Sequence, residues 1–129
     1  MSSKSMIPYL LNWKNNEWDR MEKILAEDFE IEIYWLGMVL NKSEYMSMII
    51  AITEERPNAI EFEIEDEIEL GSHTVTHITR TSDGTGLQQS EIIISEWFNK
   101  KYVKKCKSYT TLELDPKSSE KWIESFQKN

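Results

Sequence analysis

Tyr9 and Trp13 are the first pair of residues in this chain whose types and spacing could form part of a functional site, because they lie one helical turn apart. Side chains at this spacing project from the same face of a helix, so both could line one cavity. A phenol and an indole each combine an apolar ring with a polar tip, which suits a ligand-binding pocket. Tyr34, Trp35 and Trp97 have the same character. For each of these five aromatic residues the alternative is ordinary packing in a core.

His77 is the candidate for acid–base chemistry, since it lies in the middle of a segment rich in Thr, Val and Ile. A histidine in a pocket can exchange a proton near neutral pH. The alternative is a half-buried histidine that only makes a hydrogen bond. His73 would share its strand face, and the sequence leaves open whether that face looks inward. On a strand the two histidines would be about 13 Å apart, too far for one metal ion, so no metal site is predicted.

The sulfur-containing residues give weaker signals. Cys106 lies between Lys105 and Lys107, and neighbouring cations favour a thiolate. No nucleophile motif surrounds it, so a structural thiol is the better interpretation. Four methionines could line an adaptable pocket or fill the core: Met21, Met38, Met46 and Met48. No phosphate loop, dinucleotide fingerprint or Gly-x-Ser-x-Gly motif is present, and we predict no cofactor.

The composition limits the class of protein and its partners. The chain has 129 residues, 40% of them hydrophobic, with five Trp, five Tyr and four Phe, which is typical of one globular domain. Its formal net charge of −8 argues against nucleic acid and against anionic membranes as main partners. The first apolar run, residues 6–11, contains Pro8 and is too short for a targeting or membrane segment. A cytoplasmic location is the default expectation.

Three helices are predicted in the first half of the chain. Apolar residues recur at helical spacing over residues 6–13 and again over residues 18–25, with Asn16 as the expected N-cap of the second helix. Asn41 and Glu44 have the spacing of a capping box, which predicts a third helix over residues 42–52. Between the last two helices, residues 30–34 alternate in polarity and predict a strand.

The second half of the chain predicts four long strands. In residues 60–70 apolar side chains alternate with glutamates, which predicts a strand with one apolar and one acidic face. Further strands are expected over residues 74–82, 87–98 and 102–114. Turns are expected at Gly71-Ser72, Asp83–Gly86 and Asn99-Lys100. Hairpin-length connections favour an antiparallel meander.

Together these elements predict an α+β domain in which a curved, mostly antiparallel sheet wraps over N-terminal helices as a conical barrel. The mouth of such a barrel is a common place for a ligand pocket. We expect one domain over residues 1–115, followed by a tail or short helix over residues 116–129.

This order of elements resembles the nuclear transport factor 2-like (NTF2-like) superfamily, especially its SnoaL-like and ketosteroid-isomerase-like branches. The resemblance covers roughly the whole chain and is carried by residues 18–29, 40–49 and 96–103. The first stretch holds Ala26-Glu27-Asp28 before a strand, and the last is like the family's final hairpin. The resemblance implies a cystatin-like α+β fold with a conical cavity. One fold hosts many functions, so it does not by itself define an activity.

The resemblance to the isomerase branch also implies three catalytic positions. Tyr9 falls where the family has a tyrosine that stabilises an oxyanion. The general-base position falls on Ile33, which cannot accept a proton, and neighbouring Glu32 points to the opposite face of its strand. The position of the late-strand acid falls near Ile93, and a gap in the match would place Glu91 there.

Two function classes follow, with a third as an alternative. The leading prediction is a protein that binds a small apolar molecule through Tyr9, Trp13, Tyr34, Trp35, Met46 and Trp97. The first alternative is an isomerase, cyclase or dehydratase acting on a polycyclic or carbonyl substrate. In that enzyme Tyr9 would polarise a carbonyl, and His77 or Glu32 would move the proton. The second alternative is a non-catalytic interaction module.

A homodimer through the sheet is the expected assembly. The glutamate row of residues 61–69 is acidic, whereas the last strand and the turn before it carry five lysines between residues 100 and 107. A two-fold axis could place these areas of opposite charge against each other. The alternative is charge pairing between strands of one subunit.

Overall fold

The computed structural model of the protein describes residues 4–34, 36–55, 61–81 and 88–110. Within these ranges it contains three helices and six strands. In chain order they are α1 (Ile7–Lys14), α2 (Trp18–Ile24), β1 (Leu25–Ile33), β2 (Met38–Asn41), α3 (Lys42–Glu55), β3 (Phe62–Leu70), β4 (His73–Thr81), β5 (Gln88–Trp97) and β6 (Val103–Thr110).

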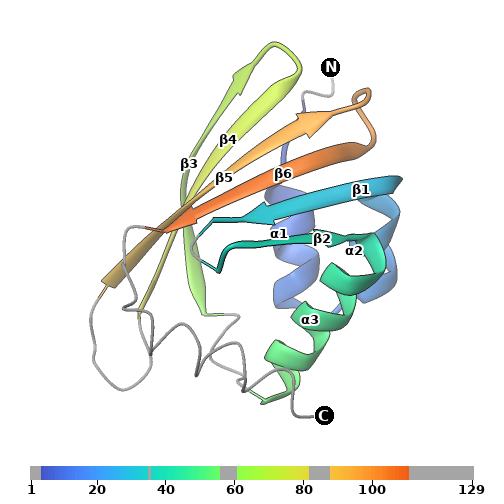
Figure 1. Ribbon diagram of the computed structural model, residues 1–129. Helices are drawn as coiled ribbons and strands as arrows, with labels where there is room; N and C mark the ends of the chain where they lie inside the picture. The colour runs from blue at the N-terminus through green and yellow to red at the C-terminus, as the bar shows by residue number, and fades with distance from the viewer. Residues whose placement is uncertain (1–3, 35, 56–60, 82–87, 111–129) are drawn as a thin grey trace.

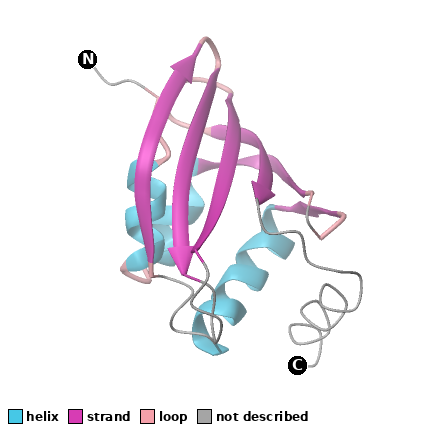
Figure 2. Cartoon of the chain, turned by 90° about the vertical axis from the view of Figure 1, so that its left-hand side faces the viewer, coloured by secondary structure: helices cyan, strands magenta, loops and turns pink. Residues whose placement is uncertain are grey.

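The six strands form one curved sheet in the order β2-β1-β6-β5-β4-β3. All neighbouring strands are antiparallel except β1 and β6, which run parallel. Figures 1 and 2 show the three helices gathered on one face of the sheet. We call this helix-covered face the inner face and the opposite one the outer face. The predicted α+β fold with a curved, mostly antiparallel sheet over N-terminal helices is confirmed.

The first two helices meet at a tight turn. α1 has Pro8 in its first turn, where a missing backbone N–H does no harm. α2 follows an N-cap at Glu17 rather than Asn16, so the predicted cap is wrong. Asn16 has a φ of 56°, a left-handed conformation that asparagine tolerates better than most residues. It therefore turns the chain between the two helices.

The first strand is longer than its alternating pattern predicts, and a short strand follows it. β1 begins at Leu25, which pairs with Val103 of β6; the register then shifts, and regular pairing with both neighbouring strands starts only at Glu30, where the alternating pattern begins. β2 has only four residues and pairs with β1 after a turn at Gly37, whose φ of 65° suits glycine. Four residues are too few for a recognisable period, so this strand escaped prediction.

The capping box of α3 is confirmed. The backbone N–H of Glu44 donates to Oδ1 of Asn41 at 2.9 Å, and the N–H of Asn41 donates to Oε1 of Glu44 at 3.0 Å. These two bonds satisfy donors that a helix start leaves without partners inside the helix. The helix extends to Glu55, three residues beyond the predicted end.

A β-bulge divides β3 into two halves of opposite orientation. The register to β4 shifts between Ile64 and Asp66, leaving Glu65 as an extra residue. Before the bulge Phe62 faces the core, but after it Ile68 and Leu70 are 51% and 59% exposed. The prediction of one continuous apolar face and one acidic face is therefore wrong, because one extra residue reverses every side chain that follows.

Strands β3 to β6 form the predicted antiparallel meander. Gly71 has a φ of 62° in the two-residue turn between β3 and β4. At the β5–β6 turn, Oδ1 of Asn99 accepts the N–H groups of Lys101 and Tyr102 at 2.7 and 3.2 Å. The expected turn at residues 83–86 and the expected tail or helix at residues 116–129 lie outside the described residues.

The hydrophobic core lies between the helices and the inner face of the sheet. Its fully buried side chains come from every layer and include Tyr9, Leu10, Met21, Phe29, Ile49, Phe62, Ile78 and Val103. The core also contains side-chain hydroxyl groups, because Thr74, Thr76 and Ser95 are fully buried on the inner face.

Candidate functional site

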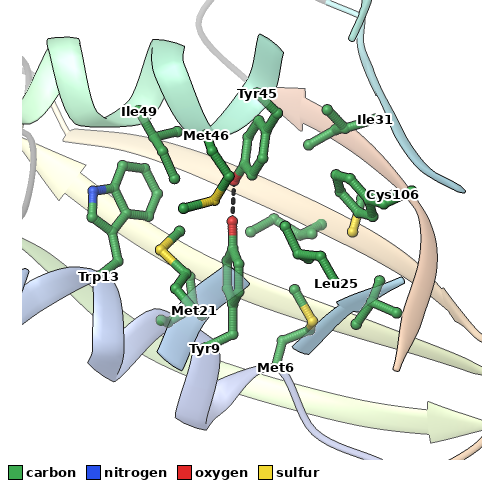
Figure 3. Packing of buried hydrophobic residues seen from close by; sticks show 14 of the residues in the cluster. Met6, Tyr9, Trp13, Met21, Leu25, Ile31, Tyr45, Met46, Ile49 and Cys106 are labelled. Carbon is green, nitrogen blue, oxygen red and sulfur yellow. Dashed lines mark hydrogen bonds between the residues drawn. The ribbon is translucent and has the colours of Figure 1, made fainter. Parts of the chain in front are cut away.

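The hydroxyl groups of Tyr9 and Tyr45 are hydrogen-bonded to each other in the interior (Figure 3). Tyr9 projects from α1 and Tyr45 from the first turn of α3, and both are buried. The capping box fixes the start of α3 and so helps to position Tyr45. The Tyr45 ring also packs against Phe29, with 5.7 Å between ring centroids. The pair of hydroxyls contains two hydrogens, and their mutual bond uses one.

The surroundings keep Tyr9 protonated. Burial raises the pKa of Tyr9 well above its ordinary value of 10.0, because the phenolate would lose its hydration. Tyr45, Cys106 and Glu91 shift this pKa in the same direction. Tyr9 is therefore a neutral hydrogen-bond donor at physiological pH. Such a group can polarise a carbonyl or hold another acceptor.

Glu91 brings a carboxylate to the same side of the sheet. Its partner on the neighbouring strand β4 is Ile78, which is fully buried on the inner face. The Ser108 hydroxyl on β6 donates to Oε1 of Glu91 at 2.8 Å. The negative charge of Glu91 makes a small contribution to the raised pKa of Tyr9. A phenol and a carboxylate thus lie on one face, an arrangement that general acid–base chemistry requires.

Cys106 is a buried neutral thiol on the inner face. Burial raises its pKa to about 12, although a hydrogen bond with the Ser95 hydroxyl, at 3.3 Å, opposes the shift. The neighbouring residues Lys105 and Lys107 belong to the opposite face of β6 by strand alternation, so they do not favour the thiolate. This supports the interpretation of Cys106 as a structural thiol.

Three other predicted binding residues also lie in the core. Trp13 is buried one turn beyond Tyr9, and its indole N–H donates to the hydroxyl of Thr53 at 2.9 Å. Met46 is buried next to Tyr45 on α3. Trp97 is buried at the end of β5, where its indole N–H donates to the hydroxyl of Thr74 at 3.1 Å. Figure 3 shows Trp13 and Met46 on the side of the cluster that faces α3.

The other candidate residues do not join Tyr9. Glu32 alternates with the buried Ile31 and Ile33, so it lies on the outer face. His77 alternates with the fully buried Thr76 and Ile78, so it also lies on the outer face. The sheet therefore separates both proposed proton-transfer residues from Tyr9, and the arrangement with His77 or Glu32 as its acid or base cannot form.

The environments of the outer-face candidates agree with a different role. His77 interacts with the Ser90 hydroxyl at 3.1 Å, which matches the alternative of a half-buried, hydrogen-bonded histidine. Tyr34 is half exposed and stacks on Tyr109 with 4.5 Å between ring centroids. Hydrogen bonds with Tyr109 and Glu32 raise the pKa of Tyr34. Trp35 lies outside the described residues.

Two residues of the inner-face site could not be assigned from the sequence. Tyr45 was visible only as one apolar position of the third helix, and its partner is 36 residues away. Glu91 depended on an uncertain match within a strand whose inward face was unknown. The alternation of β5 could have placed Glu91 with Ile93 and Ser95, but only after one of these residues was known to be buried.

Within the described ranges, no group of three or more His, Cys, Asp or Glu side chains could hold a metal ion. In the same part of the chain, no helix is both long and apolar enough to span a bilayer.

Comparison with solved structures identifies the fold. A SnoaL-like protein of unknown function from Burkholderia thailandensis has a TM-score of 0.67 and 12% identity, covering 81% of this chain and 89% of that one. A protein with a ketosteroid isomerase-like fold from Catenulispora acidiphila, in complex with trimethylamine, has a TM-score of 0.66 and 8% identity, covering 92% and 94%. A designed NTF2-fold protein has a TM-score of 0.67 and 17% identity, covering 96% and 92%.

No family model and no curated protein sequence matches this chain significantly. The likeness to these solved structures extends over most of the chain, so the protein has the NTF2-like fold that its sequence predicts. At these identities the likeness defines the fold alone, and any function must be argued from the residues on the inner face.

Proposed function

We propose that this protein binds a small, largely apolar molecule at the inner face of its sheet, with the Tyr9–Tyr45 hydroxyl pair as the polar anchor. The observation that carries this proposal is the pair itself, buried among apolar side chains. Burying polar groups reduces stability unless they are paired, so a core that serves only stability gains little from them. They are understandable if they recognise a ligand.

The surrounding residues define the chemistry of that ligand. A phenol hydroxyl both donates and accepts hydrogen bonds, so the pair can exchange its mutual bond for one to a carbonyl or ether oxygen of a ligand. The apolar part of the ligand would lie against Trp13, Met46 and their buried neighbours. A protein of the same fold was solved in complex with trimethylamine, a small molecule. This precedent supports small-molecule binding without identifying the ligand of this chain.

A thermal-shift screen of small apolar carbonyl compounds tests the proposal. A ligand that acts through the hydroxyl pair should raise the melting temperature of the wild type and lose most of that effect in Tyr9→Phe. Tyr102→Phe is the matched control, since Tyr102 is 43% exposed and far from the core. A library without any stabilising compound, or equal shifts in all three proteins, would contradict the proposal.

An enzyme of the isomerase, cyclase or dehydratase type is the second candidate function, and Glu91 is the observation that favours it. Tyr9 would donate a hydrogen bond to a substrate carbonyl while Glu91 takes a proton from a neighbouring carbon and returns it elsewhere. Once a ligand is known, Glu91→Gln should abolish its conversion but leave it bound. Conversion that survives Glu91→Gln would exclude this candidate.

A homodimer formed through the outer face is the assembly we propose. No described helix or loop covers this face, and its apolar side chains form a block over β3, β4 and β5 made of Ile68, Leu70, Val75, Ile92 and Ile94. A row of acidic and basic side chains runs alongside the block, because neighbouring strands pair them in sequence across the sheet. Its members, in order, are Glu30, Lys105, Glu96 and His73.

Such a surface is complementary to itself under a two-fold axis, which suits a second copy of this chain better than an unrelated partner. The same dimer would also serve the alternative role of a non-catalytic interaction module. Light scattering on the purified protein gives the subunit count. A dimer is expected, and a monomer at high micromolar concentration would contradict the interface.

A further inference from the structure

The segment that precedes α1, residues 4–6, is attached to the second half of β3 by two carboxylates. The backbone N–H of Met6 donates to Oε2 of Glu67 at 2.8 Å. The Lys4 ammonium forms an ion pair with Oε2 of Glu69 at 3.3 Å. Thr76 on β4 donates its hydroxyl to the same oxygen of Glu67 at 2.9 Å and so fixes this carboxylate in place. We call residues 4–6 the latch.

The β-bulge of β3 is what makes these contacts possible. With uninterrupted alternation from Phe62 and Ile64, positions 67 and 69 would lie on the outer face. The extra residue Glu65 reverses the strand, so Glu67 and Glu69 pair with the inner-face residues Thr76 and Thr74. The hydroxyl of Thr79 donates to Glu65 at 2.7 Å and holds the extra residue in position. The bulge therefore delivers two carboxylates to the latch.

The latch covers part of the core. Met6 is 1% exposed, and its side chain belongs to the same buried cluster as Tyr9 and Cys106. Figure 3 shows Met6, Leu25 and Cys106 on one side of the Tyr9 ring. Withdrawal of Met6 would therefore open the interior to solvent next to Tyr9.

α1 itself is attached by separate contacts. Tyr9 binds Tyr45, Trp13 binds Thr53, and the Lys14 ammonium binds the carbonyl of Phe62. None of these contacts involves Glu67 or Glu69. Met6 is also the N-cap of α1, and its carbonyl accepts the Leu10 N–H at 3.0 Å, so release of the latch costs this first helix bond while the other three contacts hold α1 in place. That is the arrangement expected of a local opening rather than of global unfolding.

We propose that release of the latch from Glu67 and Glu69 opens the inner face next to Tyr9 and provides the route by which a small molecule enters. The opening itself is a property of the fold, whereas its use as an entry route rests on the proposed binding function. Opening should depend on the two carboxylates, because a hydrogen bond or ion pair to a charged group is stronger than one to its neutral isostere.

Cys106 provides a native reporter of this opening, since it is the chain's one cysteine and is buried in the same cluster. The rate at which methyl methanethiosulfonate modifies Cys106 in the folded, ligand-free protein should increase about tenfold in Glu67→Gln/Glu69→Gln. Glu61→Gln/Glu63→Gln is the matched control, with the same charge change at exposed positions ahead of the bulge, and should stay within about twofold of the wild type.

Urea denaturation of each variant separates local from global opening. In Glu67→Gln/Glu69→Gln the proposal requires the labelling rate to rise by a larger factor than the equilibrium constant of global unfolding. It also requires hydrogen exchange at the Met6 amide to accelerate while amides in the middle of β5 stay protected. Labelling that is equal in both double variants, or that only follows global unfolding, would overturn it. If Glu67→Gln/Glu69→Gln does not fold, Lys4→Ala tests the same contact and should increase labelling relative to Lys23→Ala.

Labelling needs no ligand, so it can succeed or fail independently of binding. Faster labelling without any bound ligand would retain the latch and contradict the binding function. If the protein binds a ligand but Glu67→Gln/Glu69→Gln does not change the labelling rate of Cys106, the binding function is retained and the latch is contradicted.

Discussion

Tyr9 and Tyr45 donate and accept one hydrogen bond in the interior, across 36 residues of sequence and between two helices. The bond links α1 to α3 over the inner face of the sheet (Figure 3). Because burial raises the pKa of Tyr9 well above its ordinary value, Tyr9 takes part in this bond as a neutral phenol. The contribution of this bond to stability and its proposed role in holding a ligand can be tested separately.

A double-mutant cycle tests the contribution of this bond to stability. Tyr9→Phe and Tyr45→Phe should each reduce the free energy of unfolding by about 1 kcal/mol, since each leaves a buried hydroxyl without this partner. The double variant should lose less than the sum of the two, because it removes both hydroxyls together. Urea denaturation measures all four proteins. Strict additivity of the two losses would show that the hydroxyls do not interact.

The stability of the protein should fall steeply in alkaline solution because of Cys106. Its pKa is raised from 9.0 in the unfolded chain to about 12 in the folded protein. Between these values the unfolded thiol releases its proton while the folded thiol keeps it, so the unfolded state binds fewer protons and becomes favoured as pH rises. The stabilising effect is complete below the unfolded pKa and is lost progressively above it, by up to about 1.4 kcal/mol per pH unit.

Cys106→Ser provides the comparison for this alkaline effect. Over the range from about pH 8 to about pH 10.5, its free energy of unfolding should fall less than that of the wild type. Tyr9 titrates in both proteins, and the contribution of Cys106 to the raised pKa of Tyr9 is lost in Cys106→Ser together with that of the thiol itself. Parallel pH profiles for the two proteins would mean that Cys106 is accessible to water in the folded state.

The capping box should be needed to hold Tyr45 in place. Asn41→Ala removes the side-chain oxygen that accepts the Glu44 N–H, and it should reduce the free energy of unfolding by about 1 kcal/mol. Glu54→Ala, at an exposed position near the end of the same helix, should change it by less than about 0.5 kcal/mol. Equal effects of the two substitutions in urea denaturation would contradict the capping role.

Ile68→Lys should separate the proposed dimer into monomers. Ile68 lies in the outer-face block and is 51% exposed, so a lysine there would place two charges near a two-fold interface without disturbing the core of either subunit. Leu11→Lys is the matched control, because Leu11 is an exposed leucine on α1. Light scattering should report monomers for Ile68→Lys and dimers for Leu11→Lys. A dimer that persists in both would place the interface elsewhere.

The fold was predictable because its signals are local and regular. The capping box at Asn41 fixed the start of α3, and the β-propensity of the last three strands with the turn signals between them predicted the meander. These features depend on residues that are close in sequence. The bulge at Glu65 is different, because one extra residue reverses a strand whose only local irregularity is Asp66 at an otherwise apolar position of the alternation.

The site was harder to predict because it depends on which face of each strand looks inward. For β4 the choice lay between His73 with His77 and Thr74 with Thr76, and neither set is clearly apolar. The helices cover the threonine face, which places His77 on the outer face, whereas Glu91, paired with the buried Ile78, lies on the same side of the sheet as Tyr9. Such a choice is made by contacts between distant segments, which a single sequence does not display.

Native mass spectrometry of gently purified protein tests the central claim most directly, because it reports subunit count and retained small molecules together. We predict a dimer in which the wild type carries added mass from a small apolar molecule, and in which Tyr9→Phe carries much less than Tyr102→Phe. A protein without added mass that also binds no compound of a broad apolar library, or one whose added mass is unaffected by Tyr9→Phe, would contradict ligand binding at the Tyr9–Tyr45 pair.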